Sequence, residues 1–291
     1  MSTTQELELF QKLIYKFEKA QVISFTVRKG GVGKTCTSVP FAVYLASAFE
    51  EFKSSIGKHK ILFIDLDGQG DATTMLTRTF KYKGDDYTSY LPGVIEKNLK
   101  PYIIPMSDTL DLLPAGRDLR DFEPYLYDNY TKDTRSFVLD ALLEPLRTEY
   151  DYIIIDTQPS EGLVNNNAVY ASDFIVMPMQ TKEYALSGVL KFLEELDENE
   201  AAAAEILAVV PQIVKVKATA EKQIMGDAQE LLGSLLTNNL IYDRDRVEGW
   251  ALTGISYNEA TFAGDHHNKR TWEMYRAVCE ELIERLVDYG I

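Results

Sequence analysis

Short apolar runs that alternate with helical segments constrain the fold of this chain more than any other feature. Five such runs are rich in Val, Ile and Phe: Val22–Val27, Ile61–Ile64, Tyr152–Ile155, Phe174–Met177 and Ile206–Val210. Residues 35–52 and 183–200 lie between them and have apolar positions at helical spacing. Strands that are apolar throughout are typical of a parallel sheet with both faces covered, and parallel strands need crossover connections. We therefore expect an α/β fold, a mostly parallel twisted sheet with helices on both faces.

Residues 1–20 are predicted to form an amphipathic helix that precedes the main domain. Their apolar residues recur at helical spacing: Leu7, Phe10, Ile14 and Phe17. Charged residues interrupt this segment, so it lacks the apolar core of a signal peptide. Because no Gly/Ser-rich linker follows, residues 21–291 are predicted to be a single domain. Within it, residues 81–133 are rich in Tyr, Pro and Asp and are interpreted as an elaboration, with short extended pieces at 102–104 and 110–113.

Charge and composition exclude several classes of protein. The chain of 291 residues has a formal net charge of −15. It contains no apolar run long enough to span a membrane. Its two cysteines, Cys36 and Cys279, cannot form a disulfide framework, which fits a reducing compartment. The histidines lack the spacing of a metal site. Because the acidic charge opposes attraction to nucleic acid, any DNA binding would require a local basic patch.

A glycine-rich loop between the first apolar run and the first helical segment predicts a phosphate-binding site. The loop consists of Gly30, Gly31, Val32, Gly33, Lys34 and Thr35. Glycines let the backbone turn so that its N–H groups face phosphate oxygens, and the N-terminus of the following helix favours an anion. At this spacing we expect Lys34 to neutralise the β- and γ-phosphates of a nucleotide and the Thr35 hydroxyl to bind Mg²⁺.

The residues that precede the loop carry a more specific resemblance. Arg28 stands where the usual first glycine would be, and Lys29 comes next, so that the loop reads Lys-Gly-Gly-Val-Gly-Lys-Thr. This resembles the deviant Walker A loop of the ParA/MinD family of dimerising ATPases, which have the P-loop NTPase fold. The resemblance implies that Lys29 reaches across a dimer interface to the partner's nucleotide, where a second cation would stabilise developing negative charge. Cys36, which replaces the family's second Thr, completes this part of the nucleotide site.

Acidic residues follow two of the apolar runs in the order that the family shows. The segment at 64–73 resembles D-x-D-P-Q-G-N-A-T, although Gly68 replaces Pro and Asp71 replaces Asn. The resemblance implies that Asp67 positions the attacking water and that Asp65 and Asp71 lie near the Mg²⁺ shell. Carboxylates at the carboxyl end of a strand lie where an open α/β sheet binds its ligand.

A second acidic segment has the pattern of a Walker B strand. Asp156 follows the apolar run that ends at Ile155, and we expect it to hold Mg²⁺ through water. Gln158 stands where the family usually has Pro. Pro211 and Gln212 follow the last apolar run, where the resemblance places residues near adenine. The cofactors implied by these motifs together are ATP and Mg²⁺.

As a whole, the chain is similar to small plasmid ParA proteins of Gram-positive bacteria, which carry a short N-terminal helix. This resemblance implies slow ATP hydrolysis, an ATP-dependent homodimer, nonspecific binding of double-stranded DNA, and stimulation by a ParB-type centromere-binding protein during plasmid or chromosome segregation. The implied location is the cytoplasm, with association to the nucleoid when ATP is bound. Six basic residues are candidates for the DNA surface: Lys215, Lys217, Arg244, Arg246, Lys269 and Arg270.

Other proteins with this fold are distinguished by their chemistry. A MinD-like positioning ATPase ends in a basic amphipathic helix, whereas the helix predicted at 271–289 has an acidic polar face, so no membrane partner is expected. A reductase that resembles the nitrogenase iron protein needs two cysteines at its interface, which Cys36 and Cys279 do not supply. An ATP-dependent metabolic ligase or synthetase stays open as the alternative, and residues 81–133 would then build the pocket for a small substrate.

Overall fold

A twisted sheet of eight strands forms the centre of the structure, a computed structural model that describes residues 1–84, 87–199, 202–213, 219–242 and 245–290. The strands are β1 (Gln21–Phe25), β2 (Ile61–Leu66), β3 (Ile104–Pro105), β4 (Leu110–Leu113), β5 (Tyr152–Thr157), β6 (Phe174–Gln180), β7 (Glu205–Ile213) and β8 (Ile241–Tyr242). Their order across the sheet is β3-β4-β2-β5-β1-β6-β7-β8. All neighbours pair in parallel except β3, which is antiparallel to β4.

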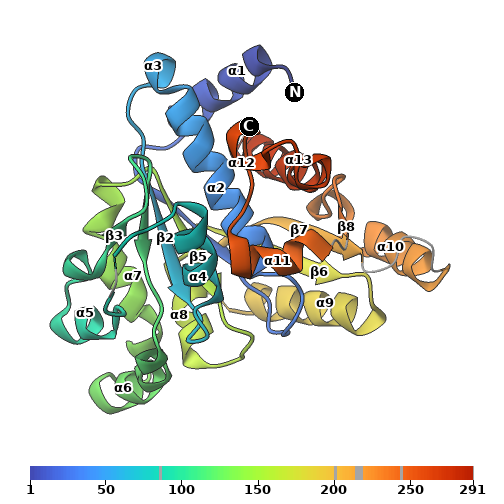
Figure 1. The fold of residues 1–291 in the computed structure, drawn as a ribbon. Helices are drawn as coiled ribbons and strands as arrows, with labels where there is room; N and C mark the ends of the chain where they lie inside the picture. Colours follow the sequence, from blue (N-terminus) through green and yellow to red (C-terminus); the bar gives the residue numbers. More distant parts are fainter. Residues whose placement is uncertain (85–86, 200–201, 214–218, 243–244, 291) are drawn as a thin grey trace.

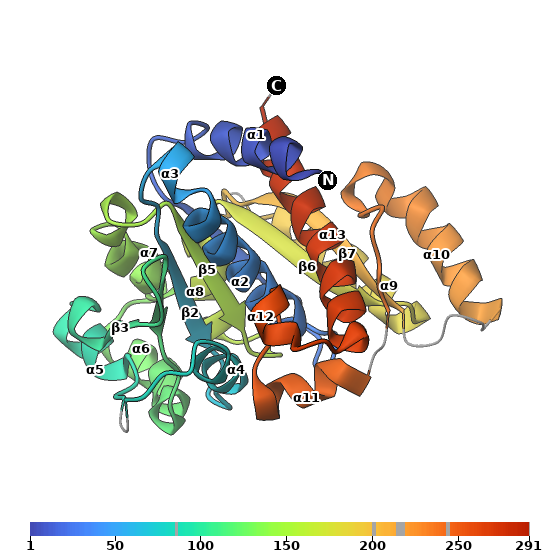
Figure 2. The same cartoon turned by 45° about the horizontal axis from the view of Figure 1, so that its top comes forward.

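Helices cover both faces of this sheet (Figures 1 and 2), so the expected fold class is confirmed. The helices are α1 (Thr3–Ile14), α2 (Thr35–Glu51), α3 (Lys53–Ile56), α4 (Asp71–Thr79), α5 (Leu91–Glu96), α6 (Phe122–Asn129), α7 (Val138–Leu143), α8 (Leu163–Ala171), α9 (Glu183–Asp197), α10 (Thr219–Leu232), α11 (Asp245–Thr253), α12 (Glu259–Phe262) and α13 (His266–Asp288). None of these helices, within the residues described, is long and apolar enough to cross a bilayer.

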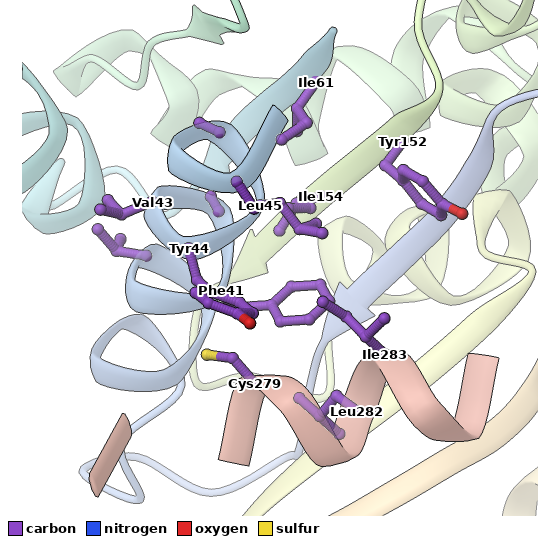
Figure 3. Close-up of a cluster of buried hydrophobic side chains, with 14 of the residues drawn as sticks. Phe41, Val43, Tyr44, Leu45, Ile61, Tyr152, Ile154, Cys279, Leu282 and Ile283 are labelled. Carbon is purple, nitrogen blue, oxygen red and sulfur yellow. The ribbon is translucent and has the colours of Figure 1, made fainter. Parts of the chain in front are cut away.

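The strands are buried on both faces because alternate side chains enter different apolar clusters. On β5, Ile154 packs in the cluster that includes α2 and α13, whereas Ile153 and Ile155 pack in the cluster that includes α7 and α8. Figure 3 shows the first cluster, in which Phe41 of α2 and Leu282 of α13 meet the strands. A sheet that is covered twice in this way needs apolar residues at every strand position, which is the pattern seen in the sequence.

The segment at 81–133, interpreted as an elaboration, contributes to the main sheet. Its strand β4 pairs in parallel with β2, with Ile61 opposite Leu110 and Ile64 opposite Leu113. The extended piece expected at 102–104 agrees only in part with the structure. Lys100–Tyr102 is a 3-10 turn, and β3 begins only at Ile104. Pro101 fixes the φ angle at the start of that turn and cannot donate a ladder hydrogen bond, which disfavours a strand there.

Helix α1 packs on α2 and α13 through a buried polar network as well as through apolar contacts. Its buried residues are Glu6, Leu9, Phe10 and Leu13. The Glu6 carboxylate accepts a hydrogen bond from the Tyr44 hydroxyl at 2.7 Å and pairs with the Arg276 guanidinium at 2.7 Å. The predicted apolar stripe did not include a buried acid. The burial of Glu6 is tolerated because both of its carboxylate oxygens have partners, which offsets the cost of removing the charge from water.

Candidate nucleotide-binding site

The site lies at the carboxyl ends of β1, β5 and β2, in the middle of the sheet. Helix α2 leaves from the end of β1 and returns to β2 on one side, whereas α8 leaves from β5 and returns to β6 on the other. Such a reversal of direction opens a crevice above the strand ends. In parallel register Asp65 lies opposite Asp156, so the sheet brings the two predicted acidic segments together beside the glycine-rich loop.

The loop has the backbone shape that its glycines allow. Gly31 has φ +68° and Gly33 has φ +88°, a region that other residues rarely adopt. Lys34 is buried, and its ammonium donates to the Lys29 carbonyl at 3.1 Å, so the side chain curls back over the loop. Burial lowers the pKa of Lys34, whereas the charges of Asp156 and Asp67 act in the opposite direction. This places a cation inside the loop, where phosphate oxygens would replace its backbone partner.

Asp156 is held by two hydroxyl groups from the first turn of α2. The Thr35 hydroxyl donates to one carboxylate oxygen at 2.6 Å and the Ser38 hydroxyl donates to the other at 3.0 Å. Burial, and then the neighbouring Asp65, raise the pKa of Asp156 to about 8, while these hydrogen bonds and Lys34 oppose the shift. Ser38 was not predicted from the sequence. Its spacing from Thr35, i to i+3 on one helix face, was the signal that could have found it.

Asp65 organises the segment that follows β2. Its carboxylate accepts hydrogen bonds from the Asp67 N–H at 3.1 Å, the Thr73 N–H at 2.8 Å and the Thr73 hydroxyl at 2.7 Å. Burial raises the pKa of Asp65 to about 6, and the hydrogen bonds from Thr73 and Asp67 oppose that shift. Because these contacts fix the start of α4, they also orient Asp67 and Asp71 toward the cleft. The roles of Asp65 and Asp71 near Mg²⁺, and of Asp67 in positioning water, stay predictions.

A cleft of about 530 Å³ opens above the loop, large enough for a nucleotide. Its lining includes residues of the loop, Asp67 and Asp71, and residues of β6, β7, β8 and α11: Gly31, Val32, Gly33, Lys34, Thr35, Cys36, Asp67, Asp71, Gln180, Gln212, Tyr242, Val247 and Glu248. Gln212 donates to the Thr37 hydroxyl at 2.8 Å and to the Gly33 carbonyl at 3.2 Å. Pro211 is inside β7, opposite Met179, and does not line this cleft.

The wall formed by α11 is joined to the end of α4. Arg78 donates to the Ala251 carbonyl, and the Ile255 N–H donates to the Thr79 hydroxyl at 2.9 Å. Gly254 has φ +77°, and a Cβ there would lie 2.6 Å from the Thr79 nitrogen, so the two backbones meet directly. Helix α4 starts at Asp71, and α11 carries Val247 and Glu248, so the contact between these helices joins two sides of the cleft.

Lys29 does not share the position of Lys34. It is absent from the lining of the cleft, and its ammonium lies over the ring of Tyr184, 2.9 Å from the ring centroid. Tyr184 is in the first turn of α9 and keeps 51% of its surface exposed. The loop therefore holds one lysine inside the cleft and one on its outer rim, a distinction that the sequence pattern alone did not locate.

Comparison with known proteins assigns these features to a family. Residues 20–209 match the sequence profile of the AAA domain family. The chain belongs to this family. It is 35% identical to the chromosome partitioning protein ParA of Myxococcus xanthus over 61% of this chain and 58% of that protein. It is 36% identical to the sporulation initiation inhibitor protein Soj of Bacillus subtilis over 60% of this chain and 63% of that protein.

These family relationships confirm the ParA/MinD resemblance drawn from the deviant loop. The match spans about 60% of the length of these two relatives, 58% of ParA and 63% of Soj. The narrower likeness to plasmid members from Gram-positive bacteria stays a prediction.

Solved structures share the fold of this family member. An ATP complex of McdA from Cyanothece has a TM-score of 0.72 at 18% identity, covering 90% of this chain and 96% of that one. A putative plasmid partition protein from Borrelia burgdorferi bound to AMPPNP has a TM-score of 0.66 at 21% identity, covering 90% and 100%. Cobyrinic acid a,c-diamide synthase from Mycobacterium smegmatis, bound to ADP and magnesium, has a TM-score of 0.60 at 23% identity, covering 73% and 82%. The fold is thus common to partition proteins and a metabolic synthase, so function depends on the site.

The basic residues predicted for DNA lie only in part within the described chain. Lys215, Lys217 and Arg244 are outside the described residues. Arg246 of α11 pairs with Asp265 at 2.8 Å, and Lys269 of α13 pairs with Glu259 at 2.7 Å, while Arg270 is exposed. Because Asp265 caps the start of α13, these three cations share one region of the surface. Acidic partners partly neutralise it, and its contact with DNA stays a prediction.

Asp156→Asn should change how the stability of the nucleotide-free protein depends on pH. The pKa of Asp156 in the fold, about 8, lies above the unfolded value of about 4, so unfolding releases a proton between these pH values. Wild-type stability must therefore decline as the pH rises through this window. The asparagine does not titrate, so its stability relative to wild type should rise by about 2–3 kcal/mol between about pH 6 and about pH 9. Urea unfolding without Mg²⁺ measures this difference.

The exposed Asp71, changed to Asn, is the matched control for that experiment, because it lies on the same side of the cleft but not in the core. The control measures how the loss of a carboxylate beside the cleft changes stability when the buried carboxylate is kept. If Asp156→Asn had the same effect as Asp71→Asn at every pH, the buried ionisation of Asp156 would be excluded.

Proposed function

We propose that this protein is a ParA-type partition ATPase. It binds MgATP, forms a homodimer, binds double-stranded DNA without sequence preference in that state, and returns to the monomer when a ParB-type centromere-binding protein stimulates hydrolysis. It acts in plasmid or chromosome segregation and resides in the cytoplasm, on the nucleoid when ATP is bound. Its relatives named ParA and Soj support this proposal.

The chemistry of the cleft supports ATP and Mg²⁺ as its ligands. The β- and γ-phosphates bind along the loop, with Lys34 and the N-terminus of α2 as the positive partners. Thr35 and Asp156 offer the oxygen ligands that Mg²⁺ prefers, and their side chains already lie 2.6 Å apart. Phosphate oxygens of ATP and water would supply the remaining ligands of a bound Mg²⁺. A bound cation would neutralise charge on the phosphates, and Asp67 would orient the attacking water.

The position of Lys29 is the observation that best supports the proposed dimerisation. In its own subunit the cleft already contains one lysine, and Lys29 lies outside it on the rim. A cation at that place can meet the phosphates of a second nucleotide that faces it across a two-fold axis. Such an added cation would stabilise the negative charge that develops near the γ-phosphate. This accelerates phosphoryl transfer, as an arginine finger does.

Binding to random-sequence duplex DNA with ATP, with ADP and without nucleotide tests the proposal. Measured from about 50 to 200 mM salt, binding should occur only with ATP and should weaken steeply as salt rises, because released counterions drive it. Absence of binding in every nucleotide state, with ATP turnover intact, would refute the partition function and favour a synthetase with a small substrate.

The surface at the start of α13 can be tested in the same assay. Arg246→Ala combined with Arg270→Ala should weaken binding and lower the salt slope by about 1 for each DNA phosphate that the protein no longer neutralises. The matched control is Lys12→Ala combined with Lys58→Ala, two exposed lysines on α1 and before β2. Equal effects of the two pairs would show that total charge, and not this surface, governs DNA binding.

A further inference from the structure

The contact between Lys29 and Tyr184 joins the outer rim of the loop to α9. The Lys29 ammonium lies 2.9 Å from the ring centroid, over the face of the ring. A cation over the face of an aromatic ring is attracted by the negative charge that the ring presents there. The ring is on the surface, with 51% of the Tyr184 residue exposed, so a second molecule can reach this contact.

Arg28 brings the loop to α9 in the same way. Its guanidinium carbon lies 5.4 Å from the ring centroid of Phe192, and the group pairs with Glu195 of α9 and with Glu161 at 3.7 Å. Tyr184 and Phe192 are at positions i and i+8 of the helix, which places them near one face. Two consecutive cations of the loop therefore lie over two rings of one helix. Figure 1 shows the loop at the lower end of α2 close to α9.

Within the described part of the chain, Lys29 has no ion pair that could replace the ring. The salt bridges there do not include its ammonium, whereas Arg28 has two acidic partners. Lys182, the next cation, is 5.8 Å from the same ring centroid and so lies beyond the close contact that Lys29 makes. Tyr184 is thus the group that determines where the Lys29 ammonium lies in the isolated subunit.

We propose that Tyr184 is a positioning residue that holds Lys29 on its own subunit and that must release it when two ATP-bound subunits meet. The inference rests on the proposed function of the loop in a dimer. To reach a partner's phosphate, the Lys29 side chain must extend away from its own surface. The ring belongs to that surface, so extension takes the ammonium off the ring. The contact therefore stabilises the monomer and opposes dimerisation.

The expected size of this opposition follows from the energy of such contacts. A symmetric dimer breaks the contact twice, once in each subunit. Cation–π contacts at exposed sites are of a size that corresponds to a factor of about 2 to 5 in an equilibrium constant for each contact. Loss of the ring should therefore lower the dimer dissociation constant by about 5- to 30-fold.

Tyr184→Leu and Tyr184→Phe separate the ring from the rest of the side chain. Sedimentation with Mg²⁺ and a non-hydrolysable ATP analogue measures the dimer dissociation constant of the full chain. Tyr184→Leu should dimerise about 5- to 30-fold more tightly than wild type, and Tyr184→Phe, which keeps the ring face, should stay within about twofold. Lys182→Gln is the matched control, because it removes the neighbouring cation, and it should also stay within about twofold.

A second readout reports the contact without a dimer. After reductive ¹³C-methylation, which keeps the charge on lysine, the Lys29 methyl resonance of the nucleotide-free protein should be shifted upfield by the ring current; Lys29→Arg assigns it. The shift should persist in Tyr184→Phe and disappear in Tyr184→Leu. A resonance that is unchanged in Tyr184→Leu, or a dimer that is equally stable or weaker in that variant, overturns the holding role while the partition function stands. A wild-type chain that stays monomeric with the ATP analogue overturns the proposed function and the holding role together.

Discussion

Asp67→Ala should abolish ATP hydrolysis and leave ATP bound. Asp67 comes directly after β2 and lines the cleft, and its backbone N–H is fixed by the Asp65 carboxylate at 3.1 Å. We propose that the Asp67 carboxylate orients the attacking water, and loss of such a group costs about 10²- to 10⁴-fold in rate. Its negative charge lies near Lys34, so removal should not weaken phosphate binding. Phosphate release under single turnover and ATP affinity by calorimetry measure the two effects.

The ATP-bound dimer should accumulate in this variant, because the step that ends it is blocked. Asp108→Ala is the control: Asp108 forms an exposed ion pair with Lys53 away from the cleft, and such pairs contribute little to stability. It should hydrolyse ATP at the wild-type rate. Turnover by Asp67→Ala within about tenfold of wild type would contradict the assigned role, and so would a loss of ATP affinity with the fold intact.

The motifs that could be predicted from the sequence are those whose chemistry lies within one short segment. The glycine positions, Lys34 and Thr35 act through a loop of fixed length, so their spacing determines their geometry. The apolar runs were sufficient for the sheet because a strand buried on both faces must be apolar at each position. Ser38 was within reach as well, since it shares a helix face with Thr35 and donates to the same carboxylate.

Contacts between segments that are far apart could not be predicted in this way. Tyr184 packs on Lys29 only because the strands carry these two segments to the same edge of the sheet. The pairing of β4 with β2 likewise depends on tertiary structure, since a four-residue strand has no sequence signal for its neighbour. Buried Glu6 shows the same limit, because its partner Arg276 is on the last helix.

Lys34→Met should remove most of the affinity of the monomer for ATP. The methionine keeps the apolar stem of this buried side chain and removes its charge. A charge-assisted hydrogen bond to phosphate is worth about 1.5–3 kcal/mol, so affinity should fall by about 10- to 150-fold. Burial already lowers the pKa of Lys34, so the charge is costly in the empty cleft, and stability without nucleotide should change little. A fluorescent ATP analogue at low protein concentration measures affinity, and urea unfolding measures stability.

Lys29→Met is the matched control, because it removes the same charge from the same loop. Lys29 lies over Tyr184 outside its own cleft, so the monomer should keep its ATP affinity within about threefold while the ATP-bound dimer is lost. We expect opposite behaviour from the two lysines because Lys34 lies in the cleft of its own subunit, whereas Lys29 lies outside it, where we propose that it meets a partner. Equal losses of monomer affinity would show that both lysines contact the same phosphates, and the loop would then act within a single subunit.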